Sequence, residues 1–507
     1  MLHTKGRIAL IAFLVVVSSL AESQNVHKPS PAIPRTWDDA AVSSMELPLP
    51  GGAPLTKHIS SDYYYRMPVR PVYKTYPIYR PDREPPDYLA MLKKEDPQIL
   101  FDSSKFQTEQ DWIRAGKLVF EAPIEFVPAS DILFSEVRDP QWYGRNQVQV
   151  TREGILPNFQ YVIREKGNVE IGILACSGCH TRVMPDGSSI EGAQGNFPDD
   201  RTFGYEESLE AKNTKDKDEI LSKLRRFMKK NYALPWAKND LNARPDHMTL
   251  EEIVGTLEAI PPGTCARQGA SIFYPVKIPD LIGVKERRYL DASGRIQHRD
   301  IGDLMRYAAL NQGADLLASY GGWIPRGSLP DPSSESRYSD EQLYALALYV
   351  YSLTPPHNPN RFDALASRGK EVFDHAGCFV CHPGPLYTNN KLIPDAQFDV
   401  PDAHMKLYDI INMPVGTDPN LTLNTRRGSG YYKVPSLKGV WYRGPFGHNG
   451  SVATLEDWLD PRRLHEDYVP SGFRGYAVSA HSVKGHTFGL SLSADERKAL
   501  IAFLKTL

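Results

Sequence analysis

Two short motifs hold the residues of this chain whose types and spacing could do chemistry. They are Cys176-Ser-Gly-Cys179-His180 and Cys378-Phe-Val-Cys381-His382. Two thiols at this spacing can reach the two vinyl groups of one porphyrin, and the histidine that follows can bind the iron from the same face. We therefore predict two covalently bound haem c groups, with His180 and His382 as proximal iron ligands.

A redox dithiol or a zinc site would leave the histidine of each motif without a role. The dithiol does not need it, and a zinc site built from two distant Cys-x-x-Cys pairs would use four sulfurs instead. With 5 cysteines and 14 histidines in 507 residues, chance gives roughly 0.001 such motifs. Cys265 is left over, and we expect a small buried residue or, alternatively, a reactive thiol.

Three segments recur in the same order around both motifs, which predicts two copies of one helical unit. The pairs are residues 112–120 with 366–373, residues 277–284 with 433–440, and residues 339–353 with 493–507. The first and last pairs are expected to be helices, the last starting at serines that can cap them. The middle pair shares Lys-x-Pro, and an arginine follows at the same offset, Arg287 and Arg443.

These elements predict a mainly α protein with two cytochrome c-like helical domains, each carrying one covalent haem, at residues 91–356 and 357–507. Apolar alternation around a Gly-Asn turn in residues 161–174 predicts a β-hairpin insertion. Residues 22–90 are rich in Pro and Tyr and are expected to form an extended N-terminal arm. Residues 192–260 are an insertion to which we assign no role.

The N-terminus has the features of a secretory signal. Lys5 and Arg7 precede an apolar run and then small residues, so we expect residues 1–21 to be a signal peptide cleaved after Ala21. The run is shorter than the roughly 20 residues that span a bilayer, so no stable membrane span is expected. We predict a periplasmic or otherwise exported protein. A net charge of −2 gives no reason to expect nucleic acid as a partner.

The second unit resembles the bacterial di-haem cytochrome c peroxidase superfamily. The similar phrases are Tyr432-Lys-Val-Pro-Ser-Leu437 and Gly444-Pro-Phe-Gly-His448-Asn-Gly450-Ser451. This superfamily includes peroxide reductases, the di-haem enzyme of methylamine metabolism and the rubber oxygenases, and the long separation of His180 from His382 is more similar to the last branch. The resemblance implies that one haem receives electrons while the other faces the substrate, and it allows for a calcium ion between the domains.

The resemblance leaves the sixth ligand of the second haem open. Peroxidase members have a methionine some residues beyond the position of His448, whereas residues 459–465 of this chain contain none. The candidates are His486, Met413, His465 and His448. We favour His486, because its place near the C-terminus resembles the distal histidine of the rubber oxygenase branch and bis-histidine ligation suits an electron-transfer haem.

The first haem has no evident sixth ligand near its motif, so an open iron is plausible there. Met184 is too close to His180 to reach the opposite face, although Met305 could close the site. The candidate catalytic residues are Arg287, Tyr289 and His298. A histidine can move a proton between peroxide oxygens, and an arginine can stabilise developing negative charge. A structural role for His298 is an equal alternative.

These residues favour an oxidoreductase that transfers electrons between two haems and reduces peroxide at one of them. One alternative is a non-enzymatic periplasmic electron carrier, in which both irons would have two protein ligands. A further alternative is oxidative cleavage of an organic substrate, as in the rubber oxygenases. The expected partners are a small redox protein or quinol-linked electron donor, and peroxide or a small-molecule substrate.

Overall fold

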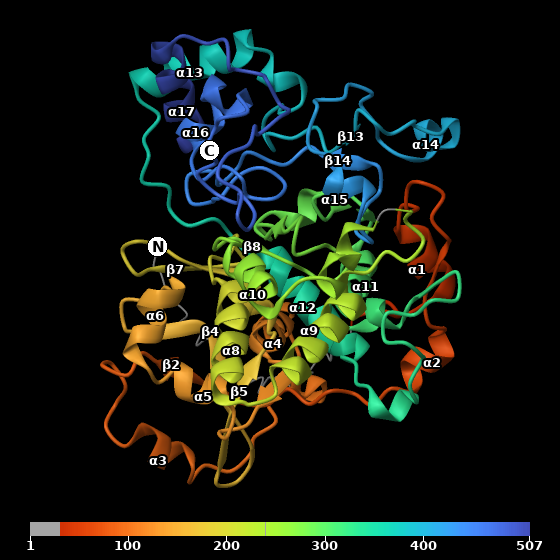
Figure 1. The fold of residues 1–507 in the computed structure, drawn as a ribbon, viewed down its shortest axis with the longest axis vertical. Helices are drawn as coiled ribbons and strands as arrows, with labels where there is room; N and C mark the ends of the chain where they lie inside the picture. The colour runs from red at the N-terminus through yellow and green to blue at the C-terminus, as the bar shows by residue number, and fades with distance from the viewer. Residues whose placement is uncertain (1–30, 239) are drawn as a thin grey trace, which may run out of the picture. The chain divides into compact units, whose positions relative to one another are not determined.

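Two equivalent helix pairs form the frame of the protein (Figure 1). In the first half α4 (Glu109–Glu121) packs on α12 (Asp340–Ser352), and in the second half α13 (Ala364–His375) packs on α17 (Ala494–Lys505). The computed structural model describes residues 31–238 and 240–507, so the predicted signal peptide lies outside the described residues. All four helices predicted from the repeated segments are confirmed.

A glycine allows each helix pair to come into contact. A Cβ on Gly116 would overlap the carbonyl oxygen of Ala345, and a Cβ on Gly369 would overlap that of Ala499. Glycine is needed where backbone meets backbone this closely. The same contact in both halves explains why the glycine recurs in the two repeated segments.

Serine caps define where α12 and α17 begin, as the sequence predicts. The side chain of Ser339 accepts a hydrogen bond from the backbone N–H of Gln342, and Ser493 accepts one from Glu496. In each case the side chain of the third residue binds back to the serine N–H, which completes a capping box. These local bonds satisfy backbone donors that the first turn of a helix leaves free.

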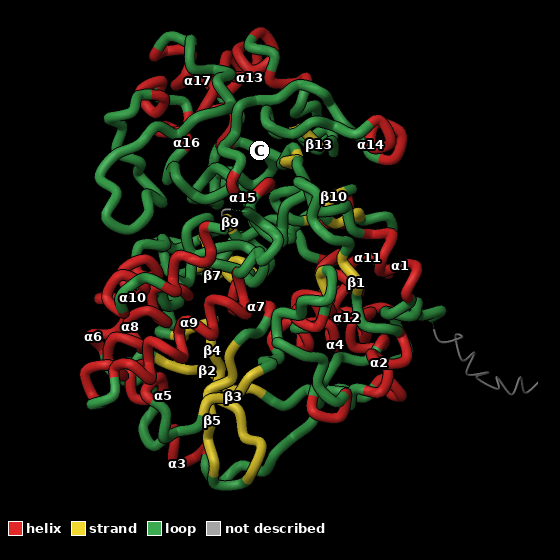
Figure 2. Tube along the Cα trace, turned by 45° about the vertical axis from the view of Figure 1, so that its right-hand side comes forward, coloured by secondary structure: helices red, strands yellow, loops and turns green. Residues whose placement is uncertain are grey.

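The predicted β-hairpin is confirmed and forms the centre of a larger sheet. β4 (Ile155–Glu165) and β5 (Asn168–Ile173) are antiparallel and meet at Gly167, whose φ is +89°. β2 (Thr75–Tyr79) and β3 (Glu125–Val127) add to its edges in the order β2-β4-β5-β3, the yellow group in Figure 2. The hairpin is thus part of the body of the first half.

The described part of the N-terminal arm is not extended, which corrects our prediction. It contributes α1 (Asp39–Met45), α2 (Ser61–Arg66), β2 and α3 (Tyr88–Leu92). Trp37 is fully buried and stacks on Tyr64 with ring centres 4.5 Å apart. Both rings belong to the apolar core that also contains Val119 and Leu346. Burial of these large aromatic surfaces outweighs the entropy lost in ordering the Pro-rich chain.

The insertion at residues 192–260 is a helical layer with its own small core. It contains α8 (Asp199–Asn213), α9 (Lys217–Tyr232) and α10 (Leu250–Glu258). α9 buries Ile220, Leu224 and Met228 on one side. Its charged residues occupy the other side, which is the pattern of an amphipathic surface helix.

Besides short 3-10 turns, the remaining elements of the described chain are α-helices and strands. They are β1 (Thr56–Lys57), α5 (Ile132–Glu136), α6 (Pro140–Asn146), α7 (Cys176–Cys179), β6 (Thr181–Val183), β7 (Ser189–Glu191), β8 (Thr264–Cys265), β9 (Val276–Lys277), β10 (Tyr289–Leu290), β11 (Ile296–Gln297), α11 (Ile301–Asn311), β12 (Ser319–Tyr320), β13 (Leu392–Pro394), α14 (Asp402–Leu407), α15 (Asn420–Leu423), β14 (Tyr431–Lys433) and α16 (Leu455–Trp458). Helix is the main regular structure, with long loops between elements. Within the described ranges, no helix combines the length and apolar character needed to cross a membrane.

Buried polar contacts join the two halves. The hydroxyl of Ser293 donates to the carbonyl of Arg427 at 2.5 Å, and the hydroxyl of Ser429 donates to the carbonyl of Ser293 at 2.6 Å. The guanidinium of Arg427 pairs with Asp315 at 2.9 Å. Because these groups are buried, their partners are needed to offset the cost of removing them from water.

Candidate haem sites

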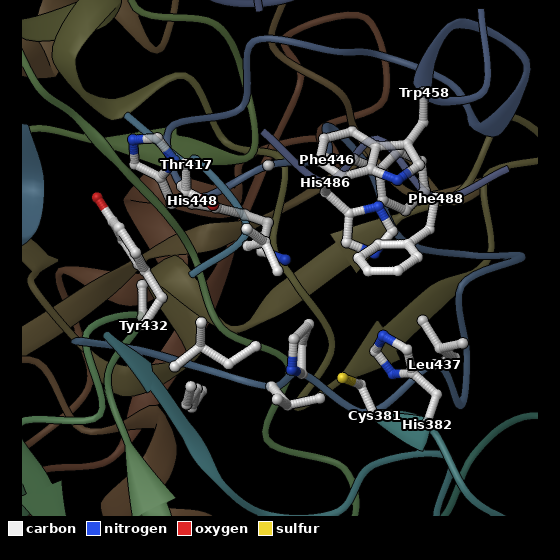
Figure 3. Close-up of a pocket in the computed structure, with 18 of the residues that line it drawn as sticks. Cys381, His382, Thr417, Tyr432, Leu437, Phe446, His448, Trp458, His486 and Phe488 are labelled. Carbon is white, nitrogen blue, oxygen red and sulfur yellow. The ribbon is translucent and has the colours of Figure 1, made fainter. Parts of the chain in front are cut away.

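A cavity of about 860 Å³ lies beside the second Cys-x-x-Cys-His motif. Cys381 and His382 lie on one wall, and His486 lies on the opposite wall between Trp458 and Phe488 (Figure 3). Cofactor sites typically occupy roughly 300–1,000 Å³. The cavity therefore has room for a large flat cofactor between the two histidines.

The backbone orients the proximal histidine in each motif. Nδ1 of His382 is 3.1 Å from the carbonyl oxygen of Tyr387, and Nδ1 of His180 is 3.0 Å from that of Pro279. In each case Nδ1–H donates a hydrogen bond to the carbonyl oxygen, so Nε2 carries no proton and its lone pair can bind a metal. Burial lowers the pKa of His382, while the carbonyls of Tyr387 and Pro435 act in the opposite direction. Pro279 and Pro435 are equivalent in the repeat.

The rings of His382 and His486 are separated by the distance that one shared metal ion requires. Their centres are 6.5 Å apart. Two imidazoles on opposite sides of one ion, with metal–nitrogen bonds of about 2 Å, would have ring centres about 6.3 Å apart. Burial lowers the pKa of His486 to about 4, and its Nδ1 is buried without a hydrogen-bond partner. The pair fits a haem iron held between them.

Arg463 holds the loop that carries His486. Its side chain is fully buried and donates hydrogen bonds to the carbonyl oxygens of Trp458 at 2.9 Å, Val483 at 2.6 Å, Gly485 at 2.9 Å and His486 at 2.7 Å. His486 itself has a φ of +46°, which is strained for a residue with a Cβ. Sequence reasoning missed Arg463, because its neighbour is also arginine and no local pattern separates the two.

Two of the other predicted sixth ligands of the second haem, Met413 and His448, line the same cavity as His486. His448 packs on Tyr432 with ring centres 5.0 Å apart, and its Nε2 is 3.8 Å from a carboxylate oxygen of Asp418. His465 is exposed. Of the four candidates, His486 has the position opposite His382.

The first motif is packed into the core of its half. Burial raises the pKa of Cys176 to about 11 and that of Cys179 to about 12, and it lowers the pKa of His180 to about 4. Buried thiols of high pKa are poor nucleophiles, which argues against a redox dithiol. Nδ2 of Asn158 donates to the carbonyl oxygen of Gly178 at 2.7 Å and fixes the turn between the cysteines.

The three candidate catalytic residues have different surroundings, and of the three the charge of Arg287 acts on His180, where it helps to lower the pKa. Arg287 and Tyr289 line the cavity beside the second motif, although we expected them at the first haem. The ring nitrogens of His298 are 2.7 Å from the carbonyl oxygen of Arg287 and 2.6 Å from the hydroxyl of Tyr351. Because both nitrogens are engaged, His298 has the surroundings of a structural histidine.

Two further predictions concern metals and methionines. Met305 is fully buried in the core of the first half, and Met184 packs beside Ile190. In residues 31–238 and 240–507, no group of three or more His, Cys, Asp or Glu side chains is arranged to hold a metal ion. The calcium ion that the resemblance allows therefore has no carboxylate cluster in this part of the chain.

Comparison with known proteins points to cytochromes. Residues 430–468 match a family described as RoxA-like, cytochrome c-like. The chain is 24% identical over 270 residues to cytochrome-c peroxidase IdrP2 of Denitromonas iodatirespirans, which covers 47% of this chain and 69% of that protein. It is 29% identical over 162 residues to cytochrome-c peroxidase IdrP1 of the same organism, covering 28% of this chain and 40% of that protein.

One solved structure shows a distant likeness to this chain. Hydrazine synthase of Kuenenia stuttgartiensis, studied under 20 bar xenon, has a TM-score of 0.30 at 16% identity and covers 57% of this chain and 87% of that one. Likenesses at this level carry no argument about function. The sequence relatives, together with two Cys-x-x-Cys-His motifs, support a relationship between this chain and the di-haem cytochrome c peroxidase superfamily of haem oxidoreductases.

Proposed function

We propose that the protein is an exported di-haem cytochrome that takes up electrons at its second haem and reduces peroxide at its first. The observation that carries the proposal is the separation of 6.5 Å between the rings of His382 and His486. An iron with two histidine ligands has no free position for peroxide, so it suits electron transfer. Peroxide reduction is then assigned to the haem at the first motif.

The chain's own groups would hold and orient the cofactors. Cys176 and Cys179 would attach one haem, and Cys378 and Cys381 the other. The carbonyls of Pro279 and Tyr387 keep the proximal histidines in the tautomer that binds iron. Haem iron at the first motif would supply the redox chemistry that cleaves the O–O bond, with two electrons and two protons converting hydrogen peroxide to two waters.

The attachment turn of the second motif supports electron entry at that haem. Phe379 and Val380 lie between its two cysteines, and they are 50% and 49% exposed. Apolar side chains at the surface next to a redox cofactor are suited to brief contact with a partner. We propose a small redox protein as the electron donor that docks there.

Ligand-binding spectra of the holoprotein test this assignment. We expect electron paramagnetic resonance to show one low-spin haem that does not respond to cyanide and a second haem that does. In His486→Ala the unresponsive haem should become high-spin and bind cyanide, whereas His465→Ala, a control at an exposed histidine, should leave the spectrum unchanged.

The test separates the enzyme from its main alternative. Two low-spin haems that both ignore cyanide and peroxide would support a non-enzymatic electron carrier. A His486→Ala spectrum identical to that of the wild type would refute the assignment of His486 as an iron ligand. Peroxide reduction by the holoprotein, with a reduced small cytochrome as electron donor, is a separate and direct measure of the activity.

A further inference from the structure

Four basic side chains meet in the cavity beside the second motif, two from each half of the chain. We call them the cationic cluster: Lys277, Arg287, Lys433 and Arg443. The first two belong to the first repeat and the last two are their equivalents in the second. The repeat thus brings matching residues together at one place, although each motif lies in its own half.

Contacts to the backbone fix the arginines of the cluster in the same way. Arg287 donates to the carbonyl oxygen of Asp280, and Arg443 donates to that of Ser436, the equivalent residue, at 2.7 Å. The Nζ atom of Lys433 lies 3.4 Å from the carbonyl oxygen of Tyr289, which belongs to the other half. These neutral acceptors orient the positive charges without neutralising them.

The four positive charges of the cluster exceed the negative charge of the carboxylates near them. The carboxylate facing it is Asp280, 3.9 Å from Nε of Arg443, and the hydroxyl of Tyr442 also donates to this carboxylate at 2.9 Å. The negative charge of Asp291 favours the charged form of Lys433. Asp291 already forms an ion pair with Arg267 at 2.6 Å, however, so it is not a dedicated counter-ion of the cluster. Among the described residues, four positive charges therefore share essentially one carboxylate.

This imbalance is costly in a buried place. The side chain of Arg443 is only 9% exposed, and its Nε is buried without a hydrogen-bond partner. Burial, followed by the neighbouring positive charges, lowers the pKa of both Lys277 and Lys433 to about 7. Buried cations without counter-ions are strongly unfavourable, so the site is built for an anion.

The rest of the cavity indicates what kind of anion this is. Leu437, Val440, Phe446 and Trp458 line its walls near the second motif. A ligand that fills the cavity therefore needs a large apolar body and a negatively charged edge. Two other carboxylates in the cavity, Asp395 and Asp418, interact with each other and with His448.

We propose that the cationic cluster binds the propionate carboxylates of the haem attached at the second motif. This rests on the proposed function, since it requires a haem at that motif. The haem is an apolar ring with two carboxylates on one edge, which matches the cavity. Lys277 and Arg287 would then hold, from the first half, a cofactor that is covalently bound to the second half, and the haem would fasten the halves together.

The redox potential of the second haem tests the proposal. A cation beside the propionates favours the reduced iron, which carries less positive charge. In Lys277→Gln we expect at least a threefold fall in the ratio of reduced to oxidised haem at a fixed potential, a shift of about 28 mV to lower values for a one-electron couple. Lys277→Arg keeps the charge and should retain the wild-type potential.

Matched controls use exposed lysines that lie close in sequence to the lysines of the cluster. Lys285→Gln is paired with Lys277→Gln, and Lys438→Gln with Lys433→Gln. Resonance Raman spectra of the propionate bending modes should change in the cluster variants and stay constant in the controls. Equal potentials and equal propionate modes in the cluster and control variants would overturn the proposal.

Two further measurements separate the remaining outcomes. Mass spectrometry of wild-type peptides shows whether Cys378 and Cys381 carry a haem; their lack of one would defeat the proposed function itself. Acetate is then titrated into the wild-type holoprotein. A potential that changes with acetate in the wild type, but not in Lys277→Gln, would show that the cluster binds a free anion, which would also overturn the proposal.

Discussion

Arg463 is predicted to keep His486 on the second haem iron, and Arg463→Gln should release it. The guanidinium makes four hydrogen bonds to backbone carbonyls of residues 458, 483, 485 and 486. Bonds from a charged donor contribute roughly 1.5–3 kcal/mol each, and they are not additive. The freed carbonyls can form hydrogen bonds to water when the loop opens. We therefore take the loss of free energy that favours the closed loop as about 4 kcal/mol in total.

A loss of this size changes the ratio of closed to open loop by about a thousandfold, since 1.36 kcal/mol is a factor of ten. The left-handed backbone of His486 adds strain that favours opening once the bonds are gone. We therefore expect Arg463→Gln to convert the second haem from low-spin to high-spin in electron paramagnetic resonance, and added imidazole to restore the low-spin signal.

The neighbouring arginine provides the control. The side chain of Arg462 is 79% exposed and pairs with Asp460, so Arg462→Gln should keep the wild-type spectrum. A lower thermal midpoint in Arg463→Gln together with an unchanged low-spin signal would refute the reasoning. That result would mean that Arg463 stabilises the loop while the iron ligand comes from elsewhere.

Two other predictions concern stability. Gly369→Ala should disrupt the packing of α13 on α17 and lower the thermal midpoint strongly, because the added methyl group overpacks the contact at a cost of about 3 kcal/mol or more. The control Gly144→Ala lies in a helix with open space around it and should raise the midpoint slightly. Equal midpoints of the two variants would contradict this prediction. Burial favours a raised pKa for Glu46, but Arg295 at 2.7 Å and His58 outweigh it and hold the pKa at about 2. Because this lies below the unfolded value of about 4.3, the pair stabilises the fold above that pH by roughly 3 kcal/mol, and the stabilisation is lost as the pH falls toward 2. Glu46→Gln should therefore have a lower midpoint than the wild type at about pH 6, and the difference should shrink at about pH 3; a difference that does not vary with pH would contradict the ion pair.

Some parts of the architecture could be predicted from the chain because their physics is local. The hairpin of β4 and β5 follows from alternation and a Gly-Asn turn, and α12 and α17 follow from a serine cap and an apolar stripe. The N-terminal segment could not be predicted in this way. Trp37 and Tyr64 find their partners only in the assembled core, so composition alone suggested an arm.

The candidate site also has some features that the sequence determines and others that depend on the tertiary structure. The two attachment motifs and the repeat are determined by the sequence itself, because covalent haem attachment needs only the spacing of two thiols and a histidine along the chain. For His486 the sequence offered a resemblance that favoured it among four candidates, and the tertiary structure places it opposite His382. Tertiary structure alone decided that Arg463 holds its loop and that Lys277 and Arg287 reach the cavity of the other half. These groups are far apart in the chain and lie next to each other only because two packed repeats leave a common cavity, which no local spacing records.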